Sequence, residues 1–330
     1  MSTAFALLVF AVGLVVSLGA SEFLVRGFGR LGTNVGLAAG LVGLLTALGA
    51  DAPEISSAIT ALLSGAKDVG LGVILGSNLF NLAALLGLSA VVASRISFRR
   101  VVLALDGAVA LWATLVVGAM LLLGLPPIVA LVLVLAVFVF YVFLLAAEPH
   151  RVDHLPLPRR GRHRLAAVAR VIHGELERTK PARDTWGPVW WIVPSIAAIV
   201  AGSFAMVNSA LVLGDHWHLS RIFLGAVALA AITSLPNAYA ATRIALSGNG
   251  TAVVSLAFNS NTLNLLAGVS LPAVLIGGLT SAPGALGEFA WLMVLTLVAI
   301  GLGYWAQGIS RWSGLVLIIG YLVFIVAILR

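Results

Sequence analysis

Two carboxylates lie in the middle of an apolar segment, on either side of a proline. They are Asp51 and Glu54, within the sequence GADAPE at positions 49–54. A spacing of three residues places both side chains on nearly the same face of a helix. At the centre of a bilayer each would cost on the order of 2.5–3.5 kcal/mol, whereas carboxylate oxygens are the ligands that hard cations such as Ca²⁺ prefer. The pattern therefore favours a cation site over a protonated or internally bonded structural pair.

A second polar pattern occurs twice, as GSNLFN at 76–81 and as NSNTLN at 259–264. Each copy has two asparagines three residues apart, so both amides face one side of a helix. A single pair would be interpreted as packing, because asparagine and serine join transmembrane helices for around 0.6 kcal/mol each. Two pairs at equivalent positions, each after an apolar segment with a proline, favour cation ligation and gating. The candidate residues are Ser77, Asn78, Asn81, Ser260, Asn261 and Asn264.

Each of the two prolines frees a backbone carbonyl, because proline removes one hydrogen bond from the helix that contains it. In lipid a freed carbonyl needs a partner, and a cation is one candidate. Three polar side chains flank the second proline, Pro236, and are expected in the same site. They are the hydroxyls of Thr233 and Ser234 and the amide of Asn237.

The elements that must hold these residues are transmembrane helices. Of 330 residues, 61% are hydrophobic and only 9% are charged, with a mean hydropathy of +1.12. A soluble chain of this size needs more charge on its surface, and apolar runs of about 20 residues cross a hydrocarbon core of roughly 30 Å. The sequence predicts an all-α polytopic membrane protein with ten spans, at about 3–25, 34–64, 69–94, 101–123, 127–147, 189–213, 220–246, 251–278, 286–306 and 312–329.

The two halves of the sequence repeat without a gap over roughly 70 residues. A shift of 183 residues superposes Pro53 on Pro236 and Ser77-Asn78 on Ser260-Asn261. Because each half has five spans, the second half crosses the membrane in the opposite direction to the first. An inverted repeat of this kind places its substrate site near the bilayer midplane, where the halves meet.

The predicted domains are a first five-helix half at 1–147, a basic loop at 148–188 and a second five-helix half at 189–330. The loop contains nine of the 19 Lys and Arg residues, between Arg151 and Arg183. With both termini extracytoplasmic and this loop cytoplasmic, 16 of the 19 fall on the cytoplasmic side, as the positive-inside rule requires. A multi-pass protein of the cell membrane is therefore expected.

Several function classes are not expected. The chain has no cysteine, which removes thiolate metal sites and cysteine nucleophiles, and it has no phosphate-binding loop at a strand-to-helix junction. We expect no cofactor, no enzymatic activity, no nucleic-acid binding and no obligatory protein partner, so the chain can act as a monomer. The expected partners are membrane lipid and inorganic cations. Asp106, six residues after Arg100, is interpreted as a structural residue near the membrane interface.

The two polar stretches resemble the two alpha repeats of the cation/calcium exchanger superfamily, which includes the sodium/calcium exchangers. The family repeats read approximately G-T-S-x-P-E followed by G-S-N-x-x-N, and this chain has GADAPE with GSNLFN and ITSLPN with NSNTLN. The resemblance implies ten helices in two inverted repeats. It also implies alternating access driven by a sodium or proton gradient, with the first helix of each half sliding across a more rigid core.

Three positions depart from the family pattern. Glu54 fits the glutamate that follows each proline as a central ligand, but its counterpart is Asn237. Asp51 stands where the family has a small hydroxyl residue, so a formal charge of −2 is moved entirely into the first repeat. Asn259 replaces the glycine that heads the second G-S-N motif; it would either hold two helices further apart or add a ligand.

The favoured function is a secondary antiporter that exports Ca²⁺ in exchange for Na⁺ or H⁺. Two alternatives remain open: a monovalent Na⁺/H⁺ exchanger, in which loss of the second glutamate reduces the preference for divalent ions, and a non-transporting membrane protein that acts as an interaction partner. A membrane-embedded hydrolase is disfavoured, because it would pair catalytic groups from separate spans, whereas Asp51 and Glu54 lie within one turn.

Overall fold

A computed structural model describes residues 2–146, 170, 189–279 and 285–329. The elements of the first half are α1 (Thr3–Val35), α2 (Ala39–Leu63), α3 (Lys67–Phe80), the π-helix η1 (Asn81–Leu88), α4 (Ser89–Val92), β1 (Arg95–Ser97), α5 (Arg100–Leu123) and α6 (Pro127–Ala146). The second half has a 3₁₀ turn, η2 (Val189–Trp191), then α9 (Ile192–His216), α10 (Arg221–Phe223), the π-helix η3 (Leu224–Leu229), α11 (Ala230–Leu246), α12 (Gly250–Leu263), the π-helix η4 (Asn264–Ser270), α13 (Leu271–Ile276), α14 (Ala285–Ala306), β2 (Gly308–Ser310) and α15 (Arg311–Ile328).

Ten helical spans account for the described residues, as predicted. Nine of them are long and apolar enough to cross a membrane by length and composition. The tenth is α2, which has 25 residues and contains Asp51, Pro53 and Glu54. These polar residues lower its mean apolarity, although its length suffices for a bilayer. Apolar side chains such as Val15, Val139 and Val193 are more than 60% exposed, which suits contact with lipid.

The first span is longer than predicted, because α1 continues past position 25 to Val35. Gly36 ends it in the left-handed conformation, at φ +74°, which glycine adopts without steric cost. Where this extension begins, Arg26 forms an ion pair at 2.9 Å with Glu22 one turn before it, an arrangement that supports a helix. The predicted end at position 25 was wrong, because Arg26 and Arg30 interrupt the apolar run but do not end the helix.

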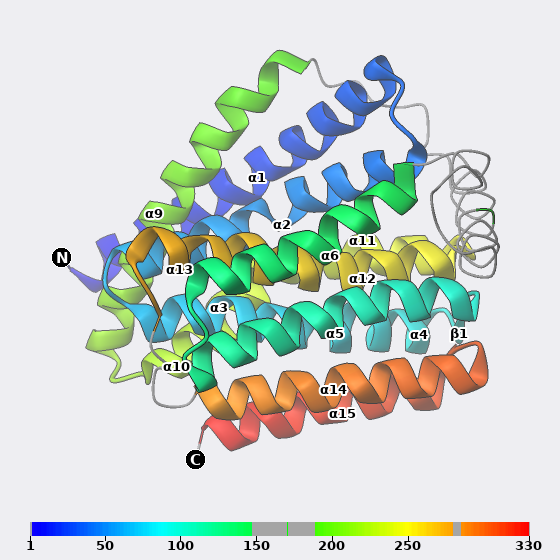
Figure 1. Ribbon diagram of the computed structural model, residues 1–330. Coiled ribbons are helices and arrows are strands. Elements are labelled where there is room, and N and C mark those ends of the chain that lie inside the picture. The colour runs from blue at the N-terminus through cyan, green and yellow to red at the C-terminus, as the bar shows by residue number, and fades with distance from the viewer. Residues whose placement is uncertain (1, 147–169, 171–188, 280–284, 330) are drawn as a thin grey trace.

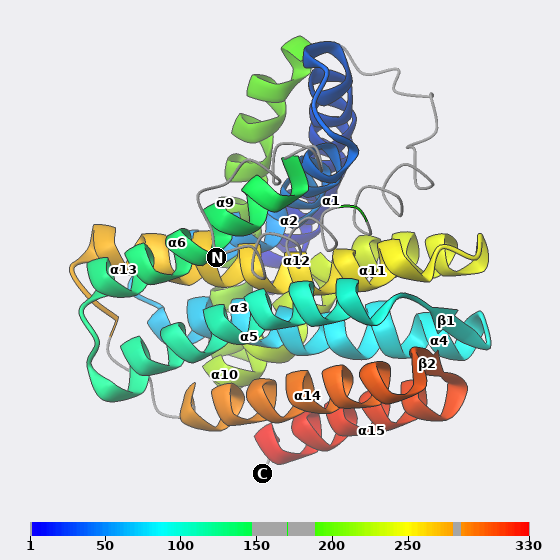
Figure 2. The ribbon, with the colours of Figure 1, turned by 45° about the vertical axis from the view of Figure 1, so that its right-hand side comes forward.

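Two helices, α1 and α9, lie against one another and project from a layered bundle of the remaining helices (Figures 1 and 2). They approach closely because Gly13 and Gly202 face one another. A Cβ added at Gly13 would lie 2.6 Å from the Gly202 carbonyl oxygen, and one added at Gly202 would lie 2.7 Å from the Gly13 carbonyl oxygen. Small residues of this kind let transmembrane helices pack backbone to backbone.

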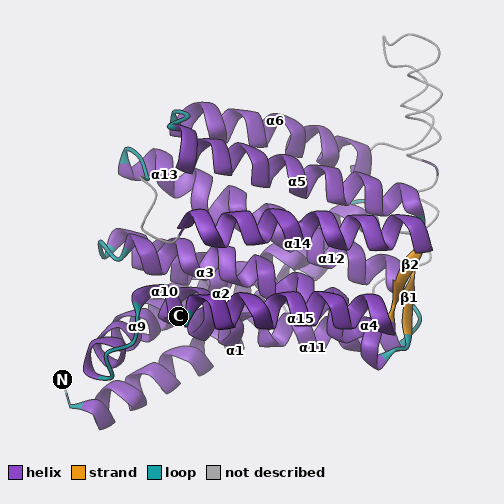
Figure 3. Cartoon of the chain, turned by 90° about the horizontal axis from the view of Figure 1, so that it is seen from below, coloured by secondary structure: helices purple, strands orange, loops and turns teal. Residues whose placement is uncertain are grey.

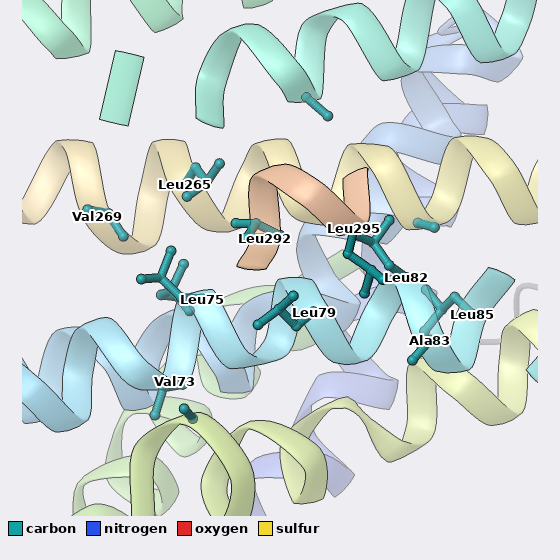
Figure 4. Packing of buried hydrophobic residues seen from close by; sticks show 14 of the residues in the cluster. Val73, Leu75, Leu79, Leu82, Ala83, Leu85, Leu265, Val269, Leu292 and Leu295 are labelled. Atoms are coloured by element: carbon teal, nitrogen blue, oxygen red, sulfur yellow. The ribbon is translucent and has the colours of Figure 1, made fainter. Parts of the chain in front are cut away.

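The continuous span α3–η1–α4 forms the centre of the bundle. Its leucines and valines from Val69 to Leu86 are no more than 1% exposed, and in Figure 4 Leu75, Leu79 and Leu82 lie among side chains from η4 and α14. A helix that is apolar on all faces is buried on all faces. The halves interlock here, because α3 also packs on η3 and α11 of the second half while α2 packs on η4.

A short sheet joins the halves at one end of the bundle and was not predicted. β1 pairs antiparallel with β2, in the register Arg95↔Ser310, Ile96↔Ile309 and Ser97↔Gly308. Figure 3 shows the two strands at the end of the bundle opposite the chain termini. The Arg95 guanidinium also donates to the Ala306 carbonyl at 2.6 Å. Strands of three residues are too short to show a period-2 pattern in the sequence.

Both ends of the described chain lie at the same end of the bundle (Figure 1), as an even number of spans requires. Which side of the membrane this end faces stays a prediction. The basic loop predicted at 148–188 lies outside the described residues except for Arg170, and the division into two domains and a loop likewise stays a prediction.

Replacing Gly76 by Ala should lower the thermal stability of the purified protein. An added Cβ would overlap the backbone of Ala226 on η3, and overpacking of this kind typically costs about 1–3 kcal/mol. The midpoint of thermal unfolding in detergent measures the effect. Gly19→Ala is the control, because a Cβ there has no atom within 4 Å. Equal midpoints in the two variants would contradict the close packing of α3 on η3.

Candidate cation site

Ten of the eleven predicted site residues form one hydrogen-bonded or directly adjoining group where four helices meet. Asp51 and Glu54 come from the middle of α2, and Ser234 and Asn237 come from the middle of α11. The asparagine motifs lie where α3 passes into η1 and where α12 passes into η4. None of these side chains is more than 4% exposed. Four segments far apart in the sequence therefore bury their polar side chains in one place.

Both asparagine motifs contain a transition from α-helix to π-helix. η1 begins at Asn81 and η4 begins at Asn264, which are equivalent positions of the repeat. A π-helical turn is rare and occurs mostly at functional sites, because its wider turn weakens the regular backbone ladder. The helices are thus irregular at the positions that carry the amides, whereas Pro53 and Pro236 lie inside continuous α-helices.

The two carboxylates are bonded by α11 through two contacts that the repeat makes equivalent. Ser234 Oγ donates to Glu54 Oε1 at 2.6 Å, and Asn237 Nδ2 donates to Asp51 Oδ1 at 2.9 Å. The shift of 183 places position 51 on 234 and position 54 on 237, so each contact joins the same two places of opposite halves. In one contact the carboxylate stands at the second place (Glu54) and in the other at the first (Asp51), but both carboxylates lie on α2 and both donors on α11. A carboxylate at 237 in place of the amide would face Asp51 at hydrogen-bonding distance.

Asn78 and Asn261 join the two halves to each other. Each side-chain amide donates to the backbone carbonyl of the other residue, in both cases at 3.1 Å. Their side-chain oxygens are also occupied, since Asn261 Oδ1 accepts from Asn81 at 3.1 Å and Asn78 Oδ1 accepts from Asn264 at 3.0 Å. With every polar atom bonded within the protein, these two asparagines hold α3 and α12 together.

Four buried oxygen atoms near the carboxylates lack any hydrogen-bond partner among the described residues. They are Asp51 Oδ2, Ser77 Oγ, Asn81 Oδ1 and Asn264 Oδ1. The amide nitrogens of these two asparagines are occupied, because Asn81 bonds Asn261 and Asn264 bonds Glu54 Oε2 at 2.9 Å. Ser77 lies directly beside Glu54. A buried oxygen without a donor is costly, and a cation bound at the carboxylates is a partner that such oxygens can take.

No Lys, Arg or His bonds to Asp51 or Glu54 in the part of the chain that is described; the ion pair found there is Glu22–Arg26. Their remaining neighbours are neutral donors, including Ser260, whose hydroxyl donates to Asp51 Oδ1 at 2.9 Å. Two buried negative charges without a cationic side chain require a positive charge from elsewhere. The donor set, two carboxylates with hydroxyl and amide oxygens, is the one that Ca²⁺ and Na⁺ accept and that transition metals do not prefer.

The carbonyl freed by Pro53 is satisfied by a serine, not left for a cation as we expected from the sequence. Ser21 of α1 donates to the Gly49 carbonyl, four residues before Pro53, at 2.9 Å. Ser203 of α9 reaches the Pro53 carbonyl at 3.5 Å and lies 3.1 Å from Ser17 of α1. These serines were not singled out from the sequence, although hydroxyls inside an apolar run were a usable signal. They link α1 and α9 to the helix that carries the carboxylates.

Three other residues differ from the sequence-based picture. Thr233, the eleventh predicted residue, donates to Leu229 and Ala230 carbonyls of its own helix, at 2.9 and 3.3 Å. Asn259 packs beside the hydroxyl of Tyr141 on α6, on another side of α12 from the carboxylates that Ser260 and Asn264 bind. Asp106 is 3% exposed and hydrogen-bonded to two helices, and its place near the membrane interface stays a prediction.

Comparisons with known proteins agree with this architecture. The family model described as "Sodium/calcium exchanger protein" matches residues 5–147 and 187–330. CaxA of Alkalimonas amylolytica, which carries the name of an antiporter, is 26% identical over 329 residues, covering 94% of both chains. Inner membrane protein YrbG of Escherichia coli (strain K12) is 25% identical over 327 residues, covering 95% of this chain and 94% of YrbG.

The same fold occurs in a solved exchanger. The sodium-calcium exchanger NCX_Mj, soaked with 2.5 mM Na⁺ and 0.1 mM Sr²⁺, superposes with a TM-score of 0.64 at 19% sequence identity. The match covers 98% of this chain and 99% of NCX_Mj. At this identity the likeness concerns the fold, which has the two-repeat, ten-helix plan described above.

Ser77→Ala should leave the stability of the cation-free protein nearly unchanged and reduce the stabilisation that Ca²⁺ gives. No hydrogen bond of regular geometry holds the Ser77 hydroxyl, which lies beside the Glu54 carboxylate. Asn78→Ala should behave oppositely, because it removes interhelical hydrogen bonds worth about 1 kcal/mol each. Unfolding midpoints with and without Ca²⁺ measure both effects. An unaltered Ca²⁺ shift in Ser77→Ala would remove this residue from the ligand set.

Proposed function

The chain belongs to the sodium/calcium exchanger protein family, and we propose that it exports Ca²⁺ from the cytoplasm in exchange for Na⁺ or H⁺. Membership of this family makes it a cation antiporter of the exchanger type. Exchange moves ions and changes no covalent bond, so we expect neither an enzymatic activity nor a cofactor. The proposal further places the protein in the cell membrane with extracytoplasmic termini and a cytoplasmic central loop.

The observation that carries the proposal is the set of unpartnered oxygens around two uncompensated carboxylates. Asp51 and Glu54 supply a formal charge of −2, which matches one divalent cation. Ser77, Asn81 and Asn264 supply neutral oxygens with no hydrogen-bond donor among the described residues. Ca²⁺ takes 6–8 oxygen ligands of these kinds. A site with only two charged ligands also suits a transported ion, which must leave as well as enter.

Alternating access requires that α1 and α9 move relative to the bundle while the cation centre stays intact. The contacts favour this division. The asparagine bonds of Asn78 and Asn261 hold α3 and α12 together. The hydrogen bonds from α1 and α9 to α2 are those of single serine hydroxyls, at Gly49 and Pro53, beside apolar packing of side chains such as Leu24. Such bonds can break and form again with different carbonyls as a helix slides. We therefore assign the sliding element to α1 and α9 as a pair.

A monovalent Na⁺/H⁺ exchanger is the second candidate, and Asn237 favours it. Its amide donates to both carboxylates, at 2.9 Å to Asp51 and 3.4 Å to Glu54. These bonds spread part of the negative charge into the protein and use oxygen lone pairs that a divalent ion would otherwise take. A non-transporting role as an interaction partner is disfavoured by the complete set of buried oxygens, and a flux measurement separates it from both exchangers.

Radiolabelled Ca²⁺ uptake into proteoliposomes, under separately imposed sodium and pH gradients, tests the main proposal. Uptake should follow one gradient and fall by about 100-fold or more in Glu54→Gln, because loss of a buried charge partner costs about 3–5 kcal/mol. Glu22→Gln is the matched control, since that carboxylate is exposed and forms an ion pair with Arg26, away from the buried group. Full activity in Glu54→Gln would contradict the proposed cation site. Sodium–proton exchange without Ca²⁺ flux would establish the monovalent alternative.

Exchanging the charge across the α2–α11 contact tests the rearranged centre. Asn237→Glu alone should impair Ca²⁺ flux, because it places a third carboxylate against Asp51. Combining it with Asp51→Ser restores a charge of −2 and a hydroxyl opposite the new carboxylate, and should recover much of the flux. The Ca²⁺/Na⁺ competition of each variant gives the ion preference. A double variant no better than the single one would contradict the equivalence of the two contacts.

A further inference from the structure

A second buried carboxylate site lies between α5, α6 and α12. Asp106 of α5 is 3% exposed and accepts two hydrogen bonds. The Tyr141 hydroxyl of α6 donates to its Oδ1 at 3.0 Å, and the Ser255 hydroxyl of α12 donates to its Oδ2 at 2.5 Å. Asn259, one turn after Ser255 on α12, packs beside the Tyr141 hydroxyl. Two helices thus direct polar side chains at the carboxylate of a third.

This group has no counterpart in the other half of the repeat. The shift of 183 places Asp106 and Tyr141 on two phenylalanines, and Ser255 and Asn259 on two glycines; these are Phe289, Phe324, Gly72 and Gly76. The equivalent glycines pack tightly against the backbone of η3. Helix packing shared by both halves therefore does not need polar residues at these places. The Asp106 group is an addition to the two-fold cation centre, and it explains the asparagine at 259.

The charge of Asp106 is not compensated by a basic side chain in the described part of the chain. The helices packed on α5 are α6, α12, η4 and α14, and their titratable groups are Tyr141, Glu288 and Tyr304. Glu288 is at the opposite end of α14 from Tyr304, over whose ring the Arg100 guanidinium stacks at 5.3 Å. An ionised carboxylate within a membrane is expensive without a counter-charge. A positive charge must therefore come from solution.

A proton fits this site and a metal ion does not. A metal such as Ca²⁺ needs 6–8 oxygen ligands, whereas here both carboxylate oxygens already accept bonds from hydroxyls. Hydroxyls donate as well as accept, so Ser255 can rotate and accept a bond once Asp106 carries the hydrogen. Asp106 lies six residues from the start of α5, about 9 Å along the helix. The route for a proton is therefore short at the end of the bundle that carries β1 and β2.

We propose that Asp106 is a proton-binding site, distinct from the cation centre, through which pH controls exchange. Protonation forms one O–H bond on Asp106 from a solvent proton and reverses the direction of a hydrogen bond to α12. The same helix carries Ser260, which bonds Asp51, and Asn264, which bonds Glu54. The effect of Asp106 protonation on transport rests on the proposed antiport, whereas the existence of the proton site does not.

Infrared difference spectroscopy tests the proton site directly. In a background of Asp51→Asn with Glu54→Gln, a pH step should give the C=O band of a protonated carboxyl. Adding Asp106→Asn should remove one component of that absorption and leave the component of Glu288, which is likewise buried at 4% exposed. Adding Glu288→Gln instead should leave the Asp106 component, because Glu288 lies at the other end of α14. Identical spectra with and without Asp106→Asn would overturn the proposal, whether or not the protein transports Ca²⁺.

Flux measurements then test the link to transport in the otherwise natural protein. Ca²⁺ flux is measured while the pH is varied on the side of the membrane at the β1–β2 end. The pH profile of the natural protein should show one titration step that the profile of Asp106→Asn lacks. The variant should stay near the rate that the natural protein reaches at the acid end of this step. Tyr141→Phe and Ser255→Ala keep the carboxylate and should shift the step. Identical pH profiles in natural protein and Asp106→Asn would overturn the link, and absence of Ca²⁺ flux in the natural protein would instead refute the antiport.

Discussion

The structure depends on two buried carboxylates that no basic side chain neutralises among the described residues. Asp51 and Glu54 share one turn of α2, and every polar group around them is a neutral donor or a free oxygen. Negative charge in a membrane interior is tolerated only with close partners. This requirement explains why α3, α11 and α12 bring hydroxyls and amides to one point.

The two-fold repeat conserves the contacts of the centre while exchanging the residues that make them. Position 51 meets position 237 and position 234 meets position 54, but the acid stands on α2 in both cases. The four asparagines of the two motifs also have two different roles. Asn78 and Asn261 use all their polar atoms between helices, and Asn81 and Asn264 keep one oxygen each without a donor. The sequence allows two interpretations of the motif, helix packing and cation ligation. The first asparagine of each motif packs helices together, and we propose cation ligation for the second.

The strength of the interhelical bonds differs between the centre and the α1–α9 pair. Inside the bundle, α3 and α12 are joined by reciprocal amide–carbonyl bonds, and leucines of α3 and η1 pack with side chains of η4 and α14 (Figure 4). Toward α1 and α9, α2 offers two carbonyls near Pro53 to single serine hydroxyls. A proline in α2 thus has a role that differs from direct cation binding, since it provides an acceptor for a neighbouring helix. The Asp106 group adds a third kind of contact, in which a titratable residue joins α5 and α6 to the helix that holds half of the centre.

The sequence by itself determined the spans, the repeat and ten of the polar residues that meet where α2, α3, α11 and α12 come together. Hydropathy located ten helices to within a few residues apart from the end of α1, and the shift of 183 aligned Ser77-Asn78 with Ser260-Asn261. These signals are local or periodic, so they survive without knowledge of the fold. Only the tertiary structure decided which oxygens stay free, that Ser21 takes the Gly49 carbonyl, that Asn259 packs beside Tyr141, and that Asp106 is buried. Each of these depends on the angle and depth at which helices distant in sequence cross, and a hydrogen bond changes with shifts of less than an ångström, which no residue pattern records.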